Sequence, residues 1–226
     1  ILIVLSEQGI AMPRGKWSPY EHGSRALCIA HWPDQFAPQK TSAIAMYCDF
    51  VPTFIDLAGG RPQSPLDGKS LKSLWLGESA KHRQSAFISN VHPFWQKAIV
   101  TEQYKLIWTG FPKEDHIHSN FASKKFFGKT WAEWNQLSQE DEAVAARIRH
   151  VLHPKRYELY DIQKDPYEVH NLAEKPAHEN LKMELLAELK QLMTDAGESL
   201  EPRQPTGKTK QATGKGKERK KRRNNR

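Results

Sequence analysis

Apolar and polar residues are spaced differently in the first third of the chain and in the rest. Residues 1–5 (ILIVL) and 26–32 (ALCIAHW) form two nearly uninterrupted apolar runs. Such runs are typical of strands buried on both faces, as in a parallel sheet covered by helices. The first run ends in the polar residues Ser6, Glu7 and Gln8. Because functional groups of open α/β sheets gather at the carboxyl ends of strands, these side chains are candidates for a site.

Helical spacing follows the second apolar run. Phe50 and Phe54 can share one face of a helix that has Asp49 as its N-cap and ends near Gly59. Two buried strands and a helix of this kind predict an α/β fold. We therefore expect residues 1–80 to be the C-terminal portion of a doubly wound α/β domain.

Short runs that alternate apolar and polar residues dominate the later part of the chain. They lie at residues 86–91, 97–101, 104–109 and 157–162. Alternation predicts antiparallel strands with one face packed and the other in water.

Helices are predicted between and after these strands. Thr130 and Ser138 are each followed three residues later by an acidic residue, which is the spacing of a capping box at a helix start. Leu185 and Leu189 lie on one face of a final helix. Strands and helices together predict a small α+β subdomain with an antiparallel sheet over residues 81–200.

Positive charge is concentrated at the end of the chain. The 226 residues have a formal net charge of +8, and residues 202–226 alone contain eleven Lys or Arg and one acid. This segment has no aliphatic side chain larger than Ala, so it cannot bury enough apolar surface to offset its ordering entropy. We expect residues 201–226 to be a disordered basic tail. It can contact polyanions by charge attraction and does not by itself indicate a specific nucleic-acid partner.

Composition excludes several classes of protein. No stretch approaches the ~18 uncharged apolar residues of a membrane span, and 38% hydrophobic residues argue against disorder throughout. Cys28 and Cys48 are too few for a disulfide scaffold or a cysteine zinc site. The chain begins inside an apolar run without Met. We interpret this as a truncated start, so the lack of a visible signal peptide says nothing of the compartment.

Five short segments, in this order along the chain, resemble the sulfatase family of the alkaline phosphatase superfamily. The resemblance covers about residues 1–195 and the C-terminal half of a sulfatase. The Trp-rich middle is most similar to the heparan N-sulfatases (N-sulfoglucosamine sulfohydrolases) and their bacterial relatives. The segments are SEQG at 6–9 with GKWSPYEHG at 15–23, DFVPT at 49–53, LDGKSL at 66–71, YKLI at 104–107, and ELYD at 158–161 with KDP at 164–166.

The resemblance implies hydrolysis of sulfate esters or sulfamates, chiefly of sulfated carbohydrates, in the periplasm or outside the cell. The family uses a formylglycine nucleophile and a divalent cation, usually Ca²⁺. The resemblance places metal ligands at Glu7 and Gln8, where the family more often has Asp followed by His or Asn; both offer the oxygen ligands that calcium prefers. It places a catalytic, sulfate-binding lysine at Lys16. His92 is a further candidate for substrate binding.

The nucleophile motif of the family, Cys/Ser-x-Pro/Ala-x-Arg, does not occur in this chain. We therefore expect the formylglycine to lie upstream in a full-length protein and this chain alone to be inactive. Two alternatives stay open. One is a phosphate or phosphonate ester hydrolase of the same superfamily, which the residue at the nucleophile position would distinguish. The other is a non-enzymatic polyanion-binding module, which deletion of residues 202–226 would test.

Overall fold

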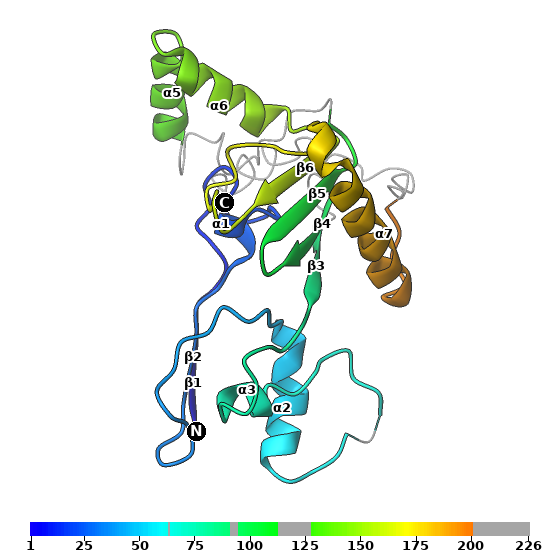
Figure 1. Ribbon diagram of the computed structural model, residues 1–226. Coiled ribbons are helices and arrows are strands. Elements are labelled where there is room, and N and C mark those ends of the chain that lie inside the picture. The colour runs from blue at the N-terminus through cyan, green and yellow to red at the C-terminus, as the bar shows by residue number, and fades with distance from the viewer. Residues whose placement is uncertain (63, 91–94, 113–127, 201–226) are drawn as a thin grey trace, which may run out of the picture.

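Two separate sheets organise the chain in the computed structural model, which describes residues 1–62, 64–90, 95–112 and 128–200. The smaller sheet lies beside two short helices, and the larger sheet lies beside a long one (Figure 1). The smaller sheet consists of β1 (Leu2–Leu5) and β2 (Cys28–His31). The larger sheet consists of β3 (Ser85–Asn90), β4 (Gln96–Thr101), β5 (Tyr104–Thr109) and β6 (Tyr157–Asp161).

The two strands of the smaller sheet pair with each other antiparallel, with Leu2 opposite His31 and Leu5 opposite Cys28. The expectation of a parallel arrangement is wrong for this pair. The segment between the strands leaves and returns at the same end of the sheet, where the Ser6 amide donates to the Leu27 carbonyl at 3.0 Å. Without a crossover to the opposite end, consecutive strands run in opposite directions.

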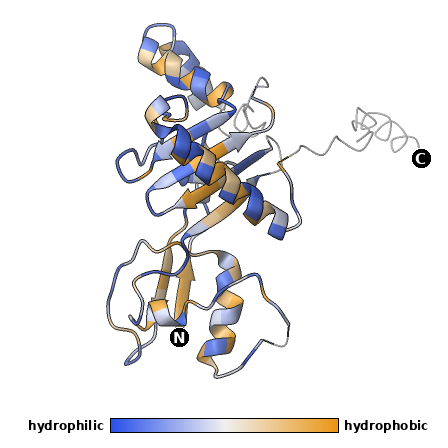
Figure 2. Ribbon diagram, turned by 45° about the vertical axis from the view of Figure 1, so that its right-hand side comes forward, coloured by the Kyte–Doolittle hydropathy of each residue, from blue (hydrophilic) through white to orange (hydrophobic). Residues whose placement is uncertain are grey.

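The apolar residues of β1 and β2 are only partly buried among the described residues. Ile3 and Ala30 pack against the cluster of Leu71, Leu74 and Trp75. On the other face, Leu2 is 59% exposed and Ile29 is 50% exposed, and Figure 2 shows this sheet in the orange of hydrophobic residues. The prediction that both faces are buried is therefore wrong for these residues.

A buried carboxylate connects the helices beside the smaller sheet. These are η1 (Tyr47–Asp49), α2 (Phe50–Leu57) and α3 (Lys72–Trp75). Asp49 is fully buried, and its carboxylate accepts hydrogen bonds from the amides of Met46 and Lys69 and from the side chains of His82 and Arg83.

The sequence assigned Asp49 as the N-cap of α2, and its side chain makes no capping bond to that helix. The turn η1 runs directly into α2, and the carboxylate instead joins three segments that are distant in sequence. Burial alone would raise the pKa of Asp49. Hydrogen bonds from Arg83, Lys69 and Met46 outweigh burial and hold the pKa well below its ordinary value.

The larger sheet has the strand order β3-β4-β5-β6 with every pair antiparallel, which confirms the predicted meander. The predicted water-exposed face is wrong, because both faces of the central strands are covered. On one face, Ile99, Leu106 and Leu159 pack against α7 (Glu179–Asp195), which is preceded by η2 (Pro176–His178).

On the other face of the larger sheet, Ala98, Ile107 and Tyr160 pack against Tyr20. Tyr20 directly precedes α1 (Glu21–Ser24) and comes from the segment between β1 and β2. Part of the predicted first domain, residues 1–80, thus covers the larger sheet. The domain boundary near residue 80 stays a prediction.

The helical hairpin of α5 (Gly128–Leu137) and α6 (Glu142–Leu152) differs from the predicted helix starts. Thr130 lies inside α5 and does not cap it. α6 is capped by Asp141, whose carboxylate accepts from the amides of Ala143 and Val144, while Ser138 donates to the Asn135 carbonyl of α5. Asp141 has the extended conformation that an N-cap needs.

No helix within the described ranges is long and apolar enough to cross a membrane. The predicted basic tail, residues 201–226, lies outside the described residues.

The contact between α7 and the larger sheet yields a prediction of stability. Leu189 is fully buried against this sheet, whereas Met183 on the same helix is exposed. Leu189→Ala is expected to lower the free energy of unfolding by about 2–5 kcal/mol, through lost burial and the cavity left behind. Met183→Ala, the matched control, is expected to change it by less than about 0.5 kcal/mol. Urea titration of both variants measures this, and equal effects would contradict the packing described.

Candidate active site at the end of β1

The candidate site residues Glu7 and Lys16 lie together just beyond the end of β1. Glu7 Oε2 is 2.6 Å from Lys16 Nζ. The Glu7 side chain is 72% exposed, so its carboxylate is open to further ligands. Gln8 follows Glu7 in sequence, and His92 lies outside the described residues. The structure therefore places a carboxylate and an ammonium at the strand end where the sequence predicted chemistry.

A tightly folded loop sets the position of Lys16. The Lys16 amide donates to the Ile10 carbonyl at 2.9 Å. A Cβ at Gly15 would overlap the same carbonyl oxygen, so the loop requires glycine there. The residues on both sides of the Gly15-Lys16 pair, Arg14 and Trp17, have positive φ angles of 60° and 69°. Non-glycine residues hold such angles only where the surroundings enforce them.

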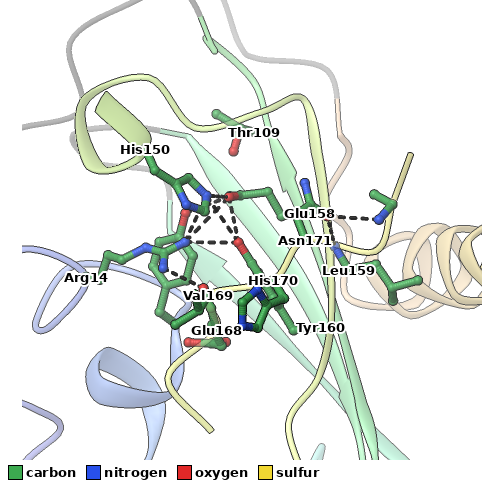
Figure 3. A network of polar contacts seen from close by, with 12 residues as sticks. Arg14, Thr109, His150, Glu158, Leu159, Tyr160, Glu168, Val169, His170 and Asn171 are labelled. Carbon is green, nitrogen blue, oxygen red and sulfur yellow. Dashed lines mark hydrogen bonds and ion pairs between the residues drawn. The ribbon is translucent and has the colours of Figure 1, made fainter. Parts of the chain in front are cut away.

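Side chains from this loop contact a buried carboxylate on the larger sheet, Glu158 (Figure 3). The Tyr20 hydroxyl donates to Glu158 Oε2 at 2.6 Å. The Arg14 guanidinium lies over the Tyr20 ring, 4.0 Å from its centroid, and donates to the Tyr160 hydroxyl at 3.0 Å. His150 of α6 completes the group through its contact with Glu158 Oε1.

The charge states in this group follow from its surroundings. Burial alone would raise the pKa of Glu158, but the hydrogen bond from His150 and the charge of Arg14 outweigh burial and lower it. Burial and the adjacent Glu158 carboxylate raise the pKa of Tyr20 and of Tyr160. Glu158 is therefore a carboxylate at neutral pH, and both tyrosines stay protonated as hydrogen-bond donors.

A second buried charge, Lys105 of β5, binds Glu21, the residue that follows Tyr20. Lys105 is 0% exposed, and its Nζ lies 2.5 Å from Glu21 Oε1 and 3.2 Å from Glu168 Oε1. The Glu21 amide donates to Glu168 Oε2 at 2.8 Å, and Arg14 donates to the Glu168 carbonyl at 2.6 Å. Tyr20 and Glu21 thus attach the Lys16 loop to the larger sheet.

The side chains of Glu7 and Gln8 at the end of β1 offer the kind of ligand atom that calcium prefers. A glutamate carboxylate and a glutamine amide offer oxygen, the element that calcium prefers, and the ion takes about six to eight such ligands. Within the described ranges, no group of three or more His, Cys, Asp or Glu side chains could hold a metal ion. Glu7 and Gln8 could therefore supply two of the ligands and not a complete site.

Sequence reasoning did not identify Arg14, His150, Glu158 or Tyr160 as residues that support the site. One signal was present, since Glu158 is a charged residue between Tyr157 and Leu159 in a predicted strand. A carboxylate in such a place needs a buried partner. Two of its partners, Tyr20 and Arg14, lie 138 and 144 residues away in sequence and carry no local pattern.

Comparison with curated proteins finds similarity to sulfatases. The chain is 26% identical to an ulvan-active sulfatase of Formosa agariphila over 208 residues, which cover 88% of this chain and 38% of that protein. It is 32% identical to human arylsulfatase A over 162 residues, which cover 70% and 28% of the two chains. An N-acetylglucosamine-6-O-sulfatase of Bacteroides thetaiotaomicron is 25% identical, with 82% and 28% covered. No family model matches the sequence.

The predicted resemblance to the sulfatases is confirmed. The chain spans 28–38% of the length of these curated sulfatases. The finer resemblance to heparan N-sulfatases stays a prediction.

Solved structures agree in fold. A protein solved with its substrate D-glucosamine-2-N,6-O-disulfate superposes with a TM-score of 0.54 at 24% identity, covering 79% of this chain and 30% of that chain. A Bacteroides thetaiotaomicron chain described as a sulfatase gives a TM-score of 0.53 at 19% identity, covering 80% and 32%. The predicted fold class, part of a sulfatase α/β domain with an antiparallel C-terminal subdomain, is thereby confirmed.

The attachment of the loop through Lys105 yields a prediction. Lys105→Met leaves the carboxylates of Glu21 and Glu168 without their buried counter-charge, so the free energy of unfolding is expected to fall by about 3–5 kcal/mol. Lys164→Met removes an exposed partner of Asp161 and is expected to cost less than about 1 kcal/mol. Urea titration of both variants provides the comparison. A Lys105→Met protein as stable as the unsubstituted chain would show that this buried pairing does not hold the loop.

Proposed function

We propose that this chain forms part of a sulfatase that hydrolyses sulfate esters or sulfamates of carbohydrates. The observation that supports this most strongly is the meeting of Glu7 and Lys16 at the end of β1, with Nζ and Oε2 2.6 Å apart. The similarity to sulfatases over 70–88% of the chain supports the same assignment. A carboxylate can bind a divalent cation and an ammonium can bind an anion, and both suit a site where a cation and a sulfate group lie together.

In this proposal Lys16 binds a sulfate oxygen. An ammonium is a compact charge that suits a tetrahedral anion, and the rigid loop around Gly15 fixes where it stands. Its contact with the exposed Glu7 leaves Lys16 free to exchange one anionic partner for another. The Lys16 ammonium would then already be in position to stabilise the charge that develops on the sulfate in the transition state.

Glu7 and Gln8 would hold a calcium ion together with ligands from a longer protein. When bound, the ion would neutralise charge on the sulfate oxygens. Neither cysteine of this chain lies in a formylglycine motif, so the nucleophile is proposed to come from residues outside the chain. The chain by itself is then inactive.

Sulfated carbohydrate is the proposed substrate class. One structural neighbour is solved with its substrate D-glucosamine-2-N,6-O-disulfate, and curated relatives are named for ulvan and N-acetylglucosamine-6-O-sulfate. A periplasmic or extracellular location and contact of the basic tail with polyanions are proposed on the family resemblance and the charge of residues 202–226.

Two substitutions separate the proposed roles of Glu7 and Lys16. In a longer sulfatase that contains this chain and a nucleophile motif, Glu7→Ala is expected to weaken calcium binding sharply. Lys16→Ala is expected to leave calcium binding nearly intact and to lower kcat by about 10²–10³-fold, because one charge-stabilising donor is lost. Calorimetry with calcium and turnover of an aryl sulfate, or of a sulfamate, measure the two effects.

Lys40→Ala is the control for loss of an exposed lysine, and it should change neither quantity. Excess calcium should restore part of the activity of Glu7→Ala and none of that of Lys16→Ala. Calcium affinity and turnover unchanged in Glu7→Ala would show that the end of β1 is not the metal site.

A further inference from the structure

Lys16 is flanked in its loop by two side chains that end on the same buried carboxylate. Arg14 precedes Lys16 by two residues and Tyr20 follows it by four. The Tyr20 hydroxyl is 2.6 Å from Glu158 Oε2. Arg14 Nη2 is 3.5 Å from Glu158 Oε1, and Figure 3 shows these two side chains pointing toward each other. Glu158 therefore holds the loop on both sides of Lys16.

The side-chain contact of Lys16 with Glu7 does not by itself fix Lys16. Its partner Glu7 is 72% exposed, and exposed ion pairs contribute about 0–1 kcal/mol. The position of Lys16 depends instead on the backbone of the loop. That backbone holds Arg14 and Trp17 at positive φ, which persists only when surrounding contacts enforce it. The contacts of Arg14 with the larger sheet are of this kind.

We propose that Glu158 is a positioning residue for Lys16, and that it acts through Tyr20 and Arg14. The proposal rests on the proposed function of Lys16 as the sulfate-binding group. It assigns a role in the reaction to a residue of the larger sheet that does not touch the Glu7–Lys16 pair. His150 of α6 belongs to the same arrangement, because its ring nitrogen contacts Glu158 Oε1 and lies 3.1 Å from Arg14 Nη2.

The two oxygens of Glu158 have separate partners, which permits a small test substitution. Oε1 faces Tyr160, His150 and Arg14, whereas Oε2 accepts from Tyr20. Tyr20→Phe removes one hydroxyl and leaves the Oε1 contacts and the ring beneath Arg14 in place. Tyr104→Phe is the matched control, since its hydroxyl accepts from Gln103 and its ring packs in the cluster on the α7 side of the sheet.

Hydrogen exchange of the purified chain tests the coupling between Glu158 and the Lys16 loop, and it requires no enzymatic activity. Tyr20→Phe is expected to speed exchange of the Gly15 and Lys16 amides by about tenfold, because a hydrogen bond to a charged group is lost. Exchange at Leu106 in β5 should stay unchanged, as should all three amides in Tyr104→Phe. Unchanged rates at Gly15 and Lys16 in Tyr20→Phe, or equal acceleration at Leu106, would overturn the proposal.

Kinetics of the longer sulfatase test whether this coupling reaches the reaction. Tyr20→Phe is expected to lower kcat by about tenfold in the unsubstituted enzyme, since small displacements of a reacting group are costly. In a Lys16→Ala background the same change should have no further effect, because Tyr20 acts through Lys16. The same loss of kcat in both backgrounds would overturn the proposal.

The two experiments separate this inference from the proposed function. If Lys16→Ala keeps full turnover, the sulfate-binding role of Lys16 fails and with it the positioning role in catalysis. Faster exchange in Tyr20→Phe would then still show that Glu158 holds the loop. If Lys16→Ala loses turnover and Tyr20→Phe alters neither exchange nor kcat, the proposed function stands and the positioning role fails.

Discussion

Buried charge on one face of the larger sheet is the constraint on which the rest of the structure depends. Glu158 and Lys105 project from neighbouring strands into a region closed to water. An unpaired charge there would cost several kcal/mol, so each must find an opposite charge or hydrogen bonds. The partners come largely from one segment, residues 14–21, which contains Lys16. Pairing the buried charges of the sheet therefore fixes the position of the Lys16 loop.

The five segments that resemble the sulfatases come together in two groups. Tyr20 and Glu21 of the first segment reach Glu158 of the fifth and Lys105 of the fourth. The second and third segments meet at Asp49, which accepts from the Lys69 amide, and at Thr53, which accepts from the Leu71 amide. Most of these residues hold backbone together, and the proposed chemistry is assigned to Glu7, Gln8 and Lys16.

The sequence predicted elements whose pattern is local. All four strands of the larger sheet, helix α7 and the position of Glu7 after a strand follow from residue spacing and are seen in the structure. Features set by distant partners were mispredicted. The direction of β2 depends on where a 22-residue connection returns, and the absence of a water-exposed face on the larger sheet depends on Tyr20, which lies 138 residues from Glu158.

The candidate site shows the same division. Glu7, Gln8 and Lys16 were predicted as site residues because they follow a strand in a recognisable order, and the structure brings Glu7 and Lys16 together. Asp49 was assigned as a cap because it stands before a helix, and nothing local indicates that His82 and Arg83 reach it. Arg14 and His150 were missed, since their roles exist only through Glu158.

A double-mutant cycle between Tyr20 and Glu158 tests the central claim most directly. The free energies of unfolding of Tyr20→Phe, Glu158→Gln and the double variant are compared with that of the unsubstituted chain. If the hydroxyl and the carboxylate act as one unit, the two losses are not additive, and the coupling energy is expected to exceed about 1 kcal/mol. Additivity within about 0.3–0.5 kcal/mol would contradict the claim that buried charge on the sheet holds the Lys16 loop.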